Sequence, residues 1–250
     1  MVEIDLIQMP SVDSTNSWAK LHLEDLDRNK MTCVVAEQQT AGRGRFERSW
    51  ISPKGNLYTT LVLFLEDLQL ASHSGQIAAL ACIDGLKKLS IDAQIKWPND
   101  LLLNGKKVGG ILAETTSFKG QYALMIGIGI NISTPKEEII AVNPDGTSLA
   151  AEGFYIEKST LLLLITETFI THLTTLKKCG FTPFIAPFNS HLAYIGKTLA
   201  FYTEKTSKSG TLIGVNEGGH LLLQQPDGTT IPIHSGESSK KVLSKKDLSS

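Results

Sequence analysis

The chain has 250 residues, of which 42% are hydrophobic and 20% charged, and its formal net charge is −1. This length suits one large domain, or a main domain with a small satellite, and the composition is rich enough for a sizeable core. A net charge near zero argues against a general attraction to nucleic acid or to an anionic membrane.

The first half of the chain is predicted to alternate strands and helices. Ile4–Met9 is expected to be a strand, which Pro10 ends. Residues 13–16, Asp-Ser-Thr-Asn, supply capping groups for a helix of about three turns that reaches Leu26. Further strands are expected at 32–38 and 56–65, and the helical spacing of apolar residues predicts a helix over 72–89.

The second half begins with a β-hairpin and ends in a different kind of structure. Asn104-Gly105, the preferred pair for a two-residue turn, predicts a hairpin over residues 100–114. A strand at 121–131, a long helix capped by Ser159 and a shorter helix at 183–192 are expected to follow. After about Gly196, short strands separated by turn signals predict a small all-β unit with a frayed polar tail.

Several common signatures are absent from the sequence. Gly42-Arg43-Gly44 begins like a dinucleotide-binding loop, but Glu47 stands where the last glycine belongs. Gly196-Lys197-Thr198 ends like a phosphate-binding P-loop, but His191 replaces the earlier glycine. The six histidines lack metal-ligand spacing and there is no Gly-x-Ser-x-Gly motif, so neither a metal site nor a hydrolase is predicted.

The cysteines and the N-terminus indicate a cytoplasmic location. Three widely separated cysteines without a Cys-x-x-Cys pair predict no disulfide framework and fit a reducing compartment. The N-terminus lacks the basic segment and apolar core of a signal peptide. The apolar runs are expected to be too short to cross a membrane.

The segment TAGRGRFERSW, residues 40–50, places three arginines and two glycines directly after a predicted strand. Glycines let backbone N–H groups approach an anion closely, and arginines supply bidentate donors for phosphate or carboxylate. The segment is therefore either a solvated surface turn or an anion-binding loop that closes over its ligand.

Two stretches around the predicted hairpin suggest a ligand site, although each also has a purely structural explanation. In IKWPND, the proline forces Trp97 into an extended conformation and places Asp100 at the hairpin entry; a packed tryptophan and a polar turn explain it equally well. In GKKVGGIL, strand alternation puts Lys107 and Gly109 on one face, where a bare glycine leaves room for a ligand. A solvated lysine pair is the alternative.

The stretch MIGIGIN, residues 125–131, has one apolar face and one nearly bare face. Its isoleucines form the first face, and the second consists of Gly127, Gly129 and Asn131. A bare face that ends in an amide suits a flat ligand. The glycines could instead let the sheet bend or let another backbone pack closely.

The order STN, QQTAGRGR, KWPND, GKKVGGIL and GIGIN resembles the biotin–protein ligases, which adenylate biotin and attach it to a carrier lysine. The motifs cover residues 11–131, and Gly-Arg-Gly-Arg with Lys-Trp-Pro-Asn-Asp in this order is highly specific. The resemblance implies an α+β fold, with a central mixed β-sheet flanked by helices over 1–194 and a small C-terminal all-β, barrel-like domain over 195–250. It favours the ligand-loop interpretation of residues 40–50.

The resemblance also implies roles for individual residues. The biotin pocket is matched by Ser14, Thr15, Asn16 and Gln39, whose polar groups suit a buried ureido ring. The loop over biotin and the adenylate phosphate is matched by Arg43, Gly44 and Arg45, and the adenine contacts by Trp50 and Asn131. Catalysis falls to Lys107 and Arg43, with Gly109 beside the lysine and Asp100 where the acceptor lysine approaches.

The implied substrates are biotin and ATP, with Mg²⁺ accompanying ATP. Biotin carboxylate attacks the α-phosphorus, giving biotinyl-5′-adenylate and pyrophosphate, and a carrier lysine then attacks the adenylate and releases AMP. The expected partner is a biotin carboxyl carrier protein, with that of acetyl-CoA carboxylase as the family expectation. No nucleic acid or membrane partner is expected, and the protein is expected to be a monomer or homodimer.

Two departures from familiar members stand out. Phe46 and Glu47 replace the fifth and sixth residues of the loop Gly-Arg-Gly-Arg-Arg-Gly-Arg, which bears on how well the adenylate is retained. The pocket motif begins at Ser14, which leaves no room before it for a winged helix, so a ligase without an N-terminal DNA-binding domain is expected.

Two other functions compete with this interpretation. A lipoate ligase or octanoyl transferase has a related fold, but is not expected to combine Gly-Arg-Gly-Arg with Lys-Trp-Pro-Asn-Asp. A non-enzymatic nucleic-acid-binding module would use the arginine loop, residues 40–50, and the small β unit. The near-neutral charge and the lack of basic patches with interleaved aromatics argue against it.

Overall fold

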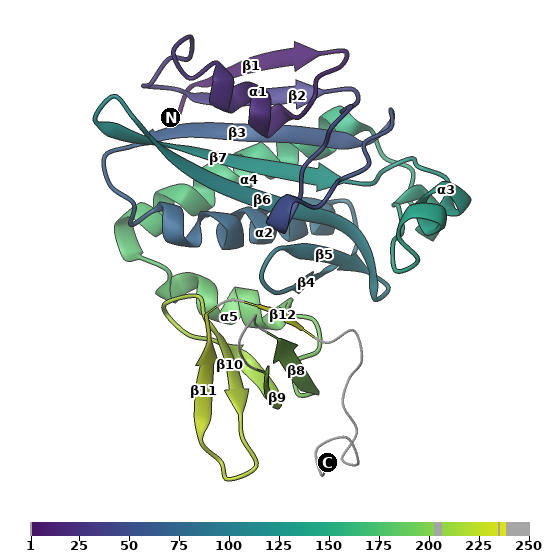
Figure 1. The fold of residues 1–250 in the computed structure, drawn as a ribbon, viewed down its shortest axis with the longest axis vertical. Helices are drawn as coiled ribbons and strands as arrows, with labels where there is room; N and C mark the ends of the chain where they lie inside the picture. Colours follow the sequence, from purple (N-terminus) through teal and green to yellow (C-terminus); the bar gives the residue numbers. More distant parts are fainter. Residues whose placement is uncertain (1, 203–206, 235, 239–250) are drawn as a thin grey trace.

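A seven-stranded mixed sheet forms the larger part of the computed structural model, which describes residues 2–202, 207–234 and 236–238 (Figure 1). In spatial order its strands are β1 (Ile4–Met9), β2 (Met31–Ala36), β3 (Leu57–Leu65), β7 (Gln121–Ile130), β6 (Lys106–Phe118), β5 (Asp100–Leu103) and β4 (Gln94–Lys96). β1 runs parallel to β2, and the other neighbours are antiparallel. The predicted α+β fold with a central mixed sheet is confirmed.

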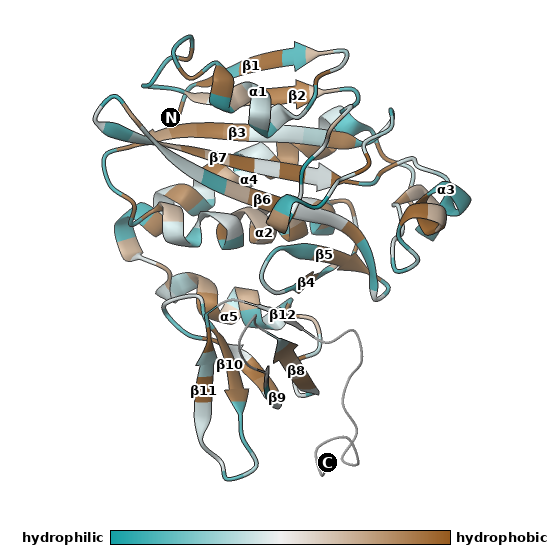
Figure 2. Ribbon diagram, viewed as in Figure 1, coloured by the Kyte–Doolittle hydropathy of each residue, from teal (hydrophilic) through white to brown (hydrophobic). Residues whose placement is uncertain are grey.

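Two long helices, α2 (Ala71–Lys88) and α4 (Lys158–Cys179), pack together along one face of this sheet. Figure 2 shows that hydrophobic residues follow β3, β7 and α2. Leu161, Ile165 and Phe169 of α4 recur at helical spacing and are fully buried. Burying one such side chain contributes about 1.5–3 kcal/mol, so this face forms the main core.

Within the described part of the chain, α4 is the one helix long and apolar enough to cross a membrane. The expectation that every apolar run is too short for this is therefore wrong on length and composition. The helix nevertheless packs against α2 through its buried side, which continues at Leu173 and Leu176. This is the packing of a core helix.

A short helix, α1 (Thr15–Leu21), covers only part of the opposite sheet face, over β2, β3 and β7. Its predicted cap is confirmed, since the Ser14 hydroxyl accepts a hydrogen bond from the Ser17 N–H at 3.4 Å. The helix has seven residues instead of the three turns expected, because His22 closes it through bonds to the carbonyls of Trp18 and Ala19. The rest of this face is left to loops.

Two helices differ from those predicted from the sequence. α4 begins at Lys158 with Glu157 at its N-cap, so Ser159 lies inside the first turn and is not the cap. A helix that the sequence did not predict, α3 (Lys136–Val142), follows β7. The chain after this helix folds back against it so closely that a Cβ on Gly146 would lie only 2.5 Å from Ile139.

The C-terminal unit is an antiparallel five-stranded sheet that follows α5 (Thr182–Ser190). Its strands, in spatial order, are β11 (Thr230–Ile233), β10 (Leu221–Gln224), β9 (Ser207–Val215), β8 (Thr198–Tyr202) and β12 (Glu237–Ser238). The predicted all-β unit is confirmed, whereas most of the predicted polar tail lies outside the described residues. The division at 194/195 into two domains stays a prediction.

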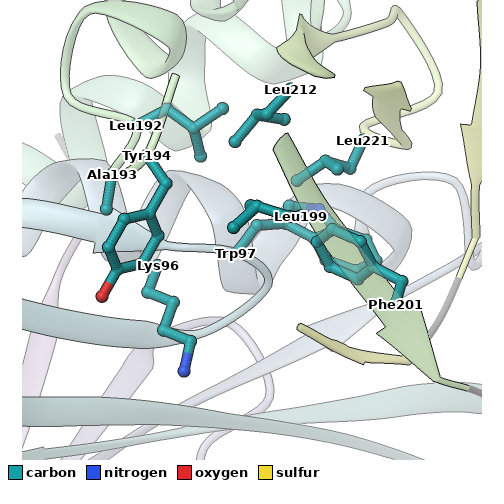
Figure 3. Close-up of a pocket in the computed structure, with 9 residues that line it drawn as sticks. All are labelled: Lys96, Trp97, Leu192, Ala193, Tyr194, Leu199, Phe201, Leu212 and Leu221. Carbon is teal, nitrogen blue, oxygen red and sulfur yellow. The ribbon is translucent and has the colours of Figure 1, made fainter. Parts of the chain in front are cut away.

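Trp97 joins the two sheets. Trp97 is 7% exposed, and its indole meets the Phe201 ring edge-on, with centroids 6.2 Å apart. Both side chains are drawn in Figure 3. Its Nε1 donates to the Gly219 carbonyl at 3.1 Å, which also accepts from Gln76 of α2 at 2.7 Å. The KWPND segment, whose Trp97–Pro98 peptide bond is cis, is thereby held between the sheet and the C-terminal unit.

Candidate active site

A cleft of about 1030 Å³ opens on the sheet face that α1 leaves uncovered. Its walls come from segments far apart in the sequence, including residues 14–16, 43–45, 48–51, 96–100, 105–107 and 141–145. Eleven of the twelve predicted site residues line it: Ser14, Thr15, Asn16, Gln39, Arg43, Gly44, Arg45, Trp50, Asp100, Lys107 and Asn131. The twelfth, Gly109, does not.

The floor of the cleft is the bare face of β7. Gly127 lies under the Asn16 amide, which a Cβ would strike, and a Cβ on Gly129 would lie 2.8 Å from Nε1 of Trp50. The isoleucines of β7 point to the main core instead. The two-faced strand predicted from the sequence is confirmed. Asn131 follows it, and its Nδ2 donates to the Thr147 carbonyl at 3.0 Å.

One end of the cleft is a network of neutral polar groups. Gln39 Oε1 accepts from the Thr15 backbone N–H at 2.9 Å, and Gln39 Nε2 donates to the Ser52 hydroxyl at 2.8 Å. The Thr60 hydroxyl lies 2.8 Å from Thr15 Oγ1 and 2.6 Å from Asn16 Oδ1. Gln39 is half-buried and the other groups are buried, and their donors and acceptors suit a neutral polar ligand.

The arginine loop crosses the cleft as a tight turn. Gly44 N–H donates to the Arg48 carbonyl at 2.7 Å, and Phe46 and Glu47 between them have positive φ angles of 54° and 58°. Non-glycine residues adopt such angles at a cost of roughly 1–2 kcal/mol each. Glu47 stands where familiar loops have glycine, so the departure noted in the sequence falls on a strained position.

Two arginines of this loop are anchored across the cleft. Arg43 Nη2 lies 2.7 Å from Oε1 of Glu114 on β6. Arg45 Nη1 donates to Oδ1 of Asn99 at 3.1 Å, and its guanidinium lies 4.9 Å from the Phe46 ring centre. The loop therefore brings two guanidinium groups to one cleft, as an anion-binding loop requires.

Lys107 and Asp100, which both line the cleft, form an ion pair with Nζ 2.6 Å from Oδ1. The lysine also lies 5.2 Å from the centre of the Trp50 ring. The Nε1 of Trp50 is buried without a hydrogen-bond partner among the described residues, so it can donate to a ligand.

The prediction that Gly109 shares a face with Lys107 is wrong. The pairing of β5 with β6 shifts so that Leu101 faces Gly109 while Leu102 faces Lys107, which leaves Val108 as a β-bulge. The bulge turns Gly109 toward the core, where a Cβ would lie 2.8 Å from the Gly129 carbonyl. Gly110 is the glycine beside the lysine, since a Cβ on it would lie 3.6 Å from Lys107 Cε.

The cleft contains functional candidates that the sequence reasoning missed. Asn99, Gly110 and residues of the segment 138–145 line the cleft, and Glu114 contacts Arg43 and Asn16, which also line it. Once the bulge is known, alternation along β6 places Gly110, Leu112 and Glu114 on the cleft face. Tyr58 also lines the cleft, and burial raises its pKa to about 12, so its phenol remains neutral.

Comparison with known proteins defines the class of this fold and site. The model of the biotin/lipoate A/B protein ligase family matches residues 8–131. The chain is 35% identical over 228 residues to the biotin–[acetyl-CoA-carboxylase] ligase of Paracoccus denitrificans, covering 88% of this chain and 94% of that one. It is 31% identical over 241 residues to the bifunctional ligase/repressor BirA of Escherichia coli, covering 95% and 74%.

A solved structure agrees with these relatives. The biotin protein ligase from Aquifex aeolicus in complex with biotin and ATP matches with a TM-score of 0.76 and 30% identity, over 94% of this chain and 97% of that one. The chain belongs to the biotin–protein ligase family.

Proposed function

We propose that this cleft activates biotin with ATP and transfers it to a lysine of a biotin carboxyl carrier protein. The main support for this proposal is that a single cleft holds two kinds of groups. A neutral polar pocket lies at Gln39 and Thr15, and a cationic section lies at Arg43, Arg45 and Lys107. A substrate with a neutral ureido end and a carboxylate end matches this order. The family membership gives the same reaction class.

The polar pocket binds the ureido ring. The Ser14, Thr15 and Asn16 segment caps and begins α1, so its groups are fixed by the helix start. Gln39 faces it with both amide atoms already bonded, which fixes the amide orientation. A rigid set of donors and acceptors binds a neutral polar ring with little loss of side-chain entropy.

Arg43 and Lys107 neutralise charge where the two substrates react. The biotin carboxylate oxygen attacks the α-phosphorus and pyrophosphate leaves, so negative charge gathers around the phosphoryl oxygens. Lys107 lines the cleft and is partly shielded, with 27% of its side chain exposed. Mg²⁺ enters as part of the substrate MgATP.

Adenine binds beside Asn131 and beside Trp50, whose indole lies over Gly129. The loop with Gly44 and Arg45 closes over the adenylate and keeps water from the mixed anhydride. Water exclusion matters because the second step needs an intact acyl group.

The acceptor lysine approaches Asp100. Its amine attacks the biotinyl carbonyl carbon, AMP leaves, and the amine's surplus proton passes to the Asp100 carboxylate or to water. A carboxylase subunit is the expected carrier. We place the reaction in the cytoplasm, in keeping with the free cysteines Cys33, Cys82 and Cys179.

The experiment is adenylate formation from [α-³²P]ATP with biotin, octanoate or lipoate as the second substrate. We expect labelled adenylate with biotin and little with the two fatty acids. Adenylate with lipoate or octanoate alone would assign the cleft to the related ligases, and none with any acid would contradict a ligase function.

A further inference from the structure

Glu114 bridges the polar pocket and the arginine loop. It lies on the cleft face of β6, and 26% of its side chain is exposed. Its Oε1 is 2.7 Å from Arg43 Nη2, and its Oε2 accepts from Asn16 Nδ2 at 2.8 Å. One carboxylate thus holds a cation of the loop with one oxygen and an amide of the pocket with the other.

The bond to Glu114 fixes which way the Asn16 amide points. Because Nδ2 donates to the carboxylate and to the Leu112 carbonyl at 3.2 Å, Oδ1 faces the Thr60 hydroxyl. From Thr60 the contacts continue through Thr15 to Gln39. The orientation of the pocket's donors therefore depends on the carboxylate.

The same chain of contacts returns to the far end of the loop. Gln39 donates to the Ser52 hydroxyl, which donates to the Trp50 carbonyl at 2.9 Å. Arg43 and Trp50, near the two ends of the arginine loop, are therefore joined through the floor of the pocket. A ligand that tightens the pocket acts on both ends of the loop.

We propose that Glu114 is a positioning residue that couples occupation of the polar pocket to closure of the arginine loop. The carboxylate holds Arg43 at the cleft wall, and a bound ligand tightens the network that carries this carboxylate. This inference rests on the proposed function, since it takes biotin as the pocket ligand and the adenylate as the species that the loop retains.

Two substitutions separate the two contacts. Glu114→Gln keeps an oxygen for Asn16 Nδ2 and nearly the same volume, but removes the ion pair with Arg43. Glu114→Ala removes both contacts. Glu3→Gln is the matched control, because Glu3 forms an ion pair of similar length with Lys30, at 2.8 Å, far from the cleft.

The measurements are biotin affinity by calorimetry, adenylate release by stopped flow, and trypsin cleavage within the loop with and without biotin. For Glu114→Gln we expect biotin affinity within about twofold of wild type. Adenylate release should be about fivefold faster, which corresponds to the free energy of a partly exposed ion pair. Biotin should no longer protect the loop from trypsin. For Glu114→Ala we also expect biotin affinity weaker by roughly tenfold. The control should match wild type in all three.

The coupling itself is tested in a double mutant. If Glu114 acts through Arg43, then Arg43→Gln with Glu114→Gln should release adenylate no faster than Arg43→Gln alone. Additive effects, or wild-type release and protection in Glu114→Gln, would overturn the proposal. Failure of the proposed function looks different, because wild type itself would then form no adenylate.

Discussion

Arg45 Nη1 donates a hydrogen bond to Asn99 Oδ1 across 3.1 Å, so the arginine loop is fastened to the KWPND segment. Asn99 is itself fixed to β6, since its Nδ2 donates to the Ile111 carbonyl and its carbonyl accepts from the Ile111 N–H, both at 2.9 Å. Hydrogen bonds therefore connect the arginine loop, through Asn99, to β6, the strand that carries Lys107.

This link predicts that Asn99→Ala loosens the closed loop. Removing one hydrogen bond to a charged group costs about 1.5–3 kcal/mol, so adenylate release should accelerate by at least about tenfold. Stopped-flow release of labelled adenylate measures this, with Asn29→Ala on an exposed loop as the control. Unchanged release in Asn99→Ala would mean that the Arg45 contact does not hold the loop.

Arg45→Gly should leave adenylate formation possible but allow early escape of the intermediate. The substitution removes the Asn99 contact and the stacking on Phe46, and adds backbone entropy to the open loop. Escaped adenylate then acylates lysines on bystander proteins. Biotin on albumin mixed into the reaction, measured by streptavidin blot, should rise relative to wild type, and equal labelling would contradict the prediction.

Glu47→Gly should act in the opposite direction. Glu47 has a φ of 58°, which glycine adopts without a Cβ penalty, and its carboxylate is removed from the loop. We expect adenylate release to slow by a few-fold. Faster release would show that the added flexibility of the open loop outweighs the relief of strain.

Lys107→Ala should reduce adenylate formation by about 100–1,000-fold while leaving the fold intact. The lysine is partly exposed in the cleft, so no core contact is lost, although Asp100 loses its partner. Circular dichroism and thermal melting check the fold, and single-turnover formation of adenylate checks the chemistry. Near-normal formation at unchanged biotin affinity would remove Lys107 from its assigned role.

The β-bulge at Val108 makes the neighbouring glycines unequal. In Gly109→Ala, the new Cβ would lie 2.8 Å from the Gly129 carbonyl, so we expect a loss of about 1–3 kcal/mol in unfolding free energy. In Gly110→Ala, the Cβ lies 3.6 Å from Lys107 Cε, so stability should hold while adenylate formation falls. Urea melts and activity that show the reverse pattern would contradict the assigned register.

The sequence predicted those parts of the fold that depend on local periodicity. Alternation in MIGIGIN correctly gave a bare face at Gly127 and Gly129, because the side-chain period of a strand is set within the strand itself. The capping role of Ser14 was correct for the same reason, since it depends on the next three residues.

The failures come from pairing between distant segments. Gly109 was placed on the wrong face because a bulge depends on how β5 and β6 pair, and GKKVGGIL alone does not record it. The roles of Asn99 and Glu114 were missed because each depends on an arginine more than fifty residues away in the chain. The packing partners of Trp97, Phe201 and Gly219 of the C-terminal unit, could not be inferred from the KWPND segment alone, because they lie more than one hundred residues away in the chain.

Transfer of biotin to a carrier protein tests the proposed ligase activity. Purified enzyme, biotin and MgATP are incubated with a biotin carboxyl carrier domain, and the carrier is weighed by mass spectrometry. We predict that the carrier gains the mass of one biotinyl group and that this gain requires ATP. The gain should disappear when the carrier's acceptor lysine is replaced by arginine. An unchanged carrier mass, while a known biotin–protein ligase modifies the same carrier, would contradict a biotin–protein ligase activity.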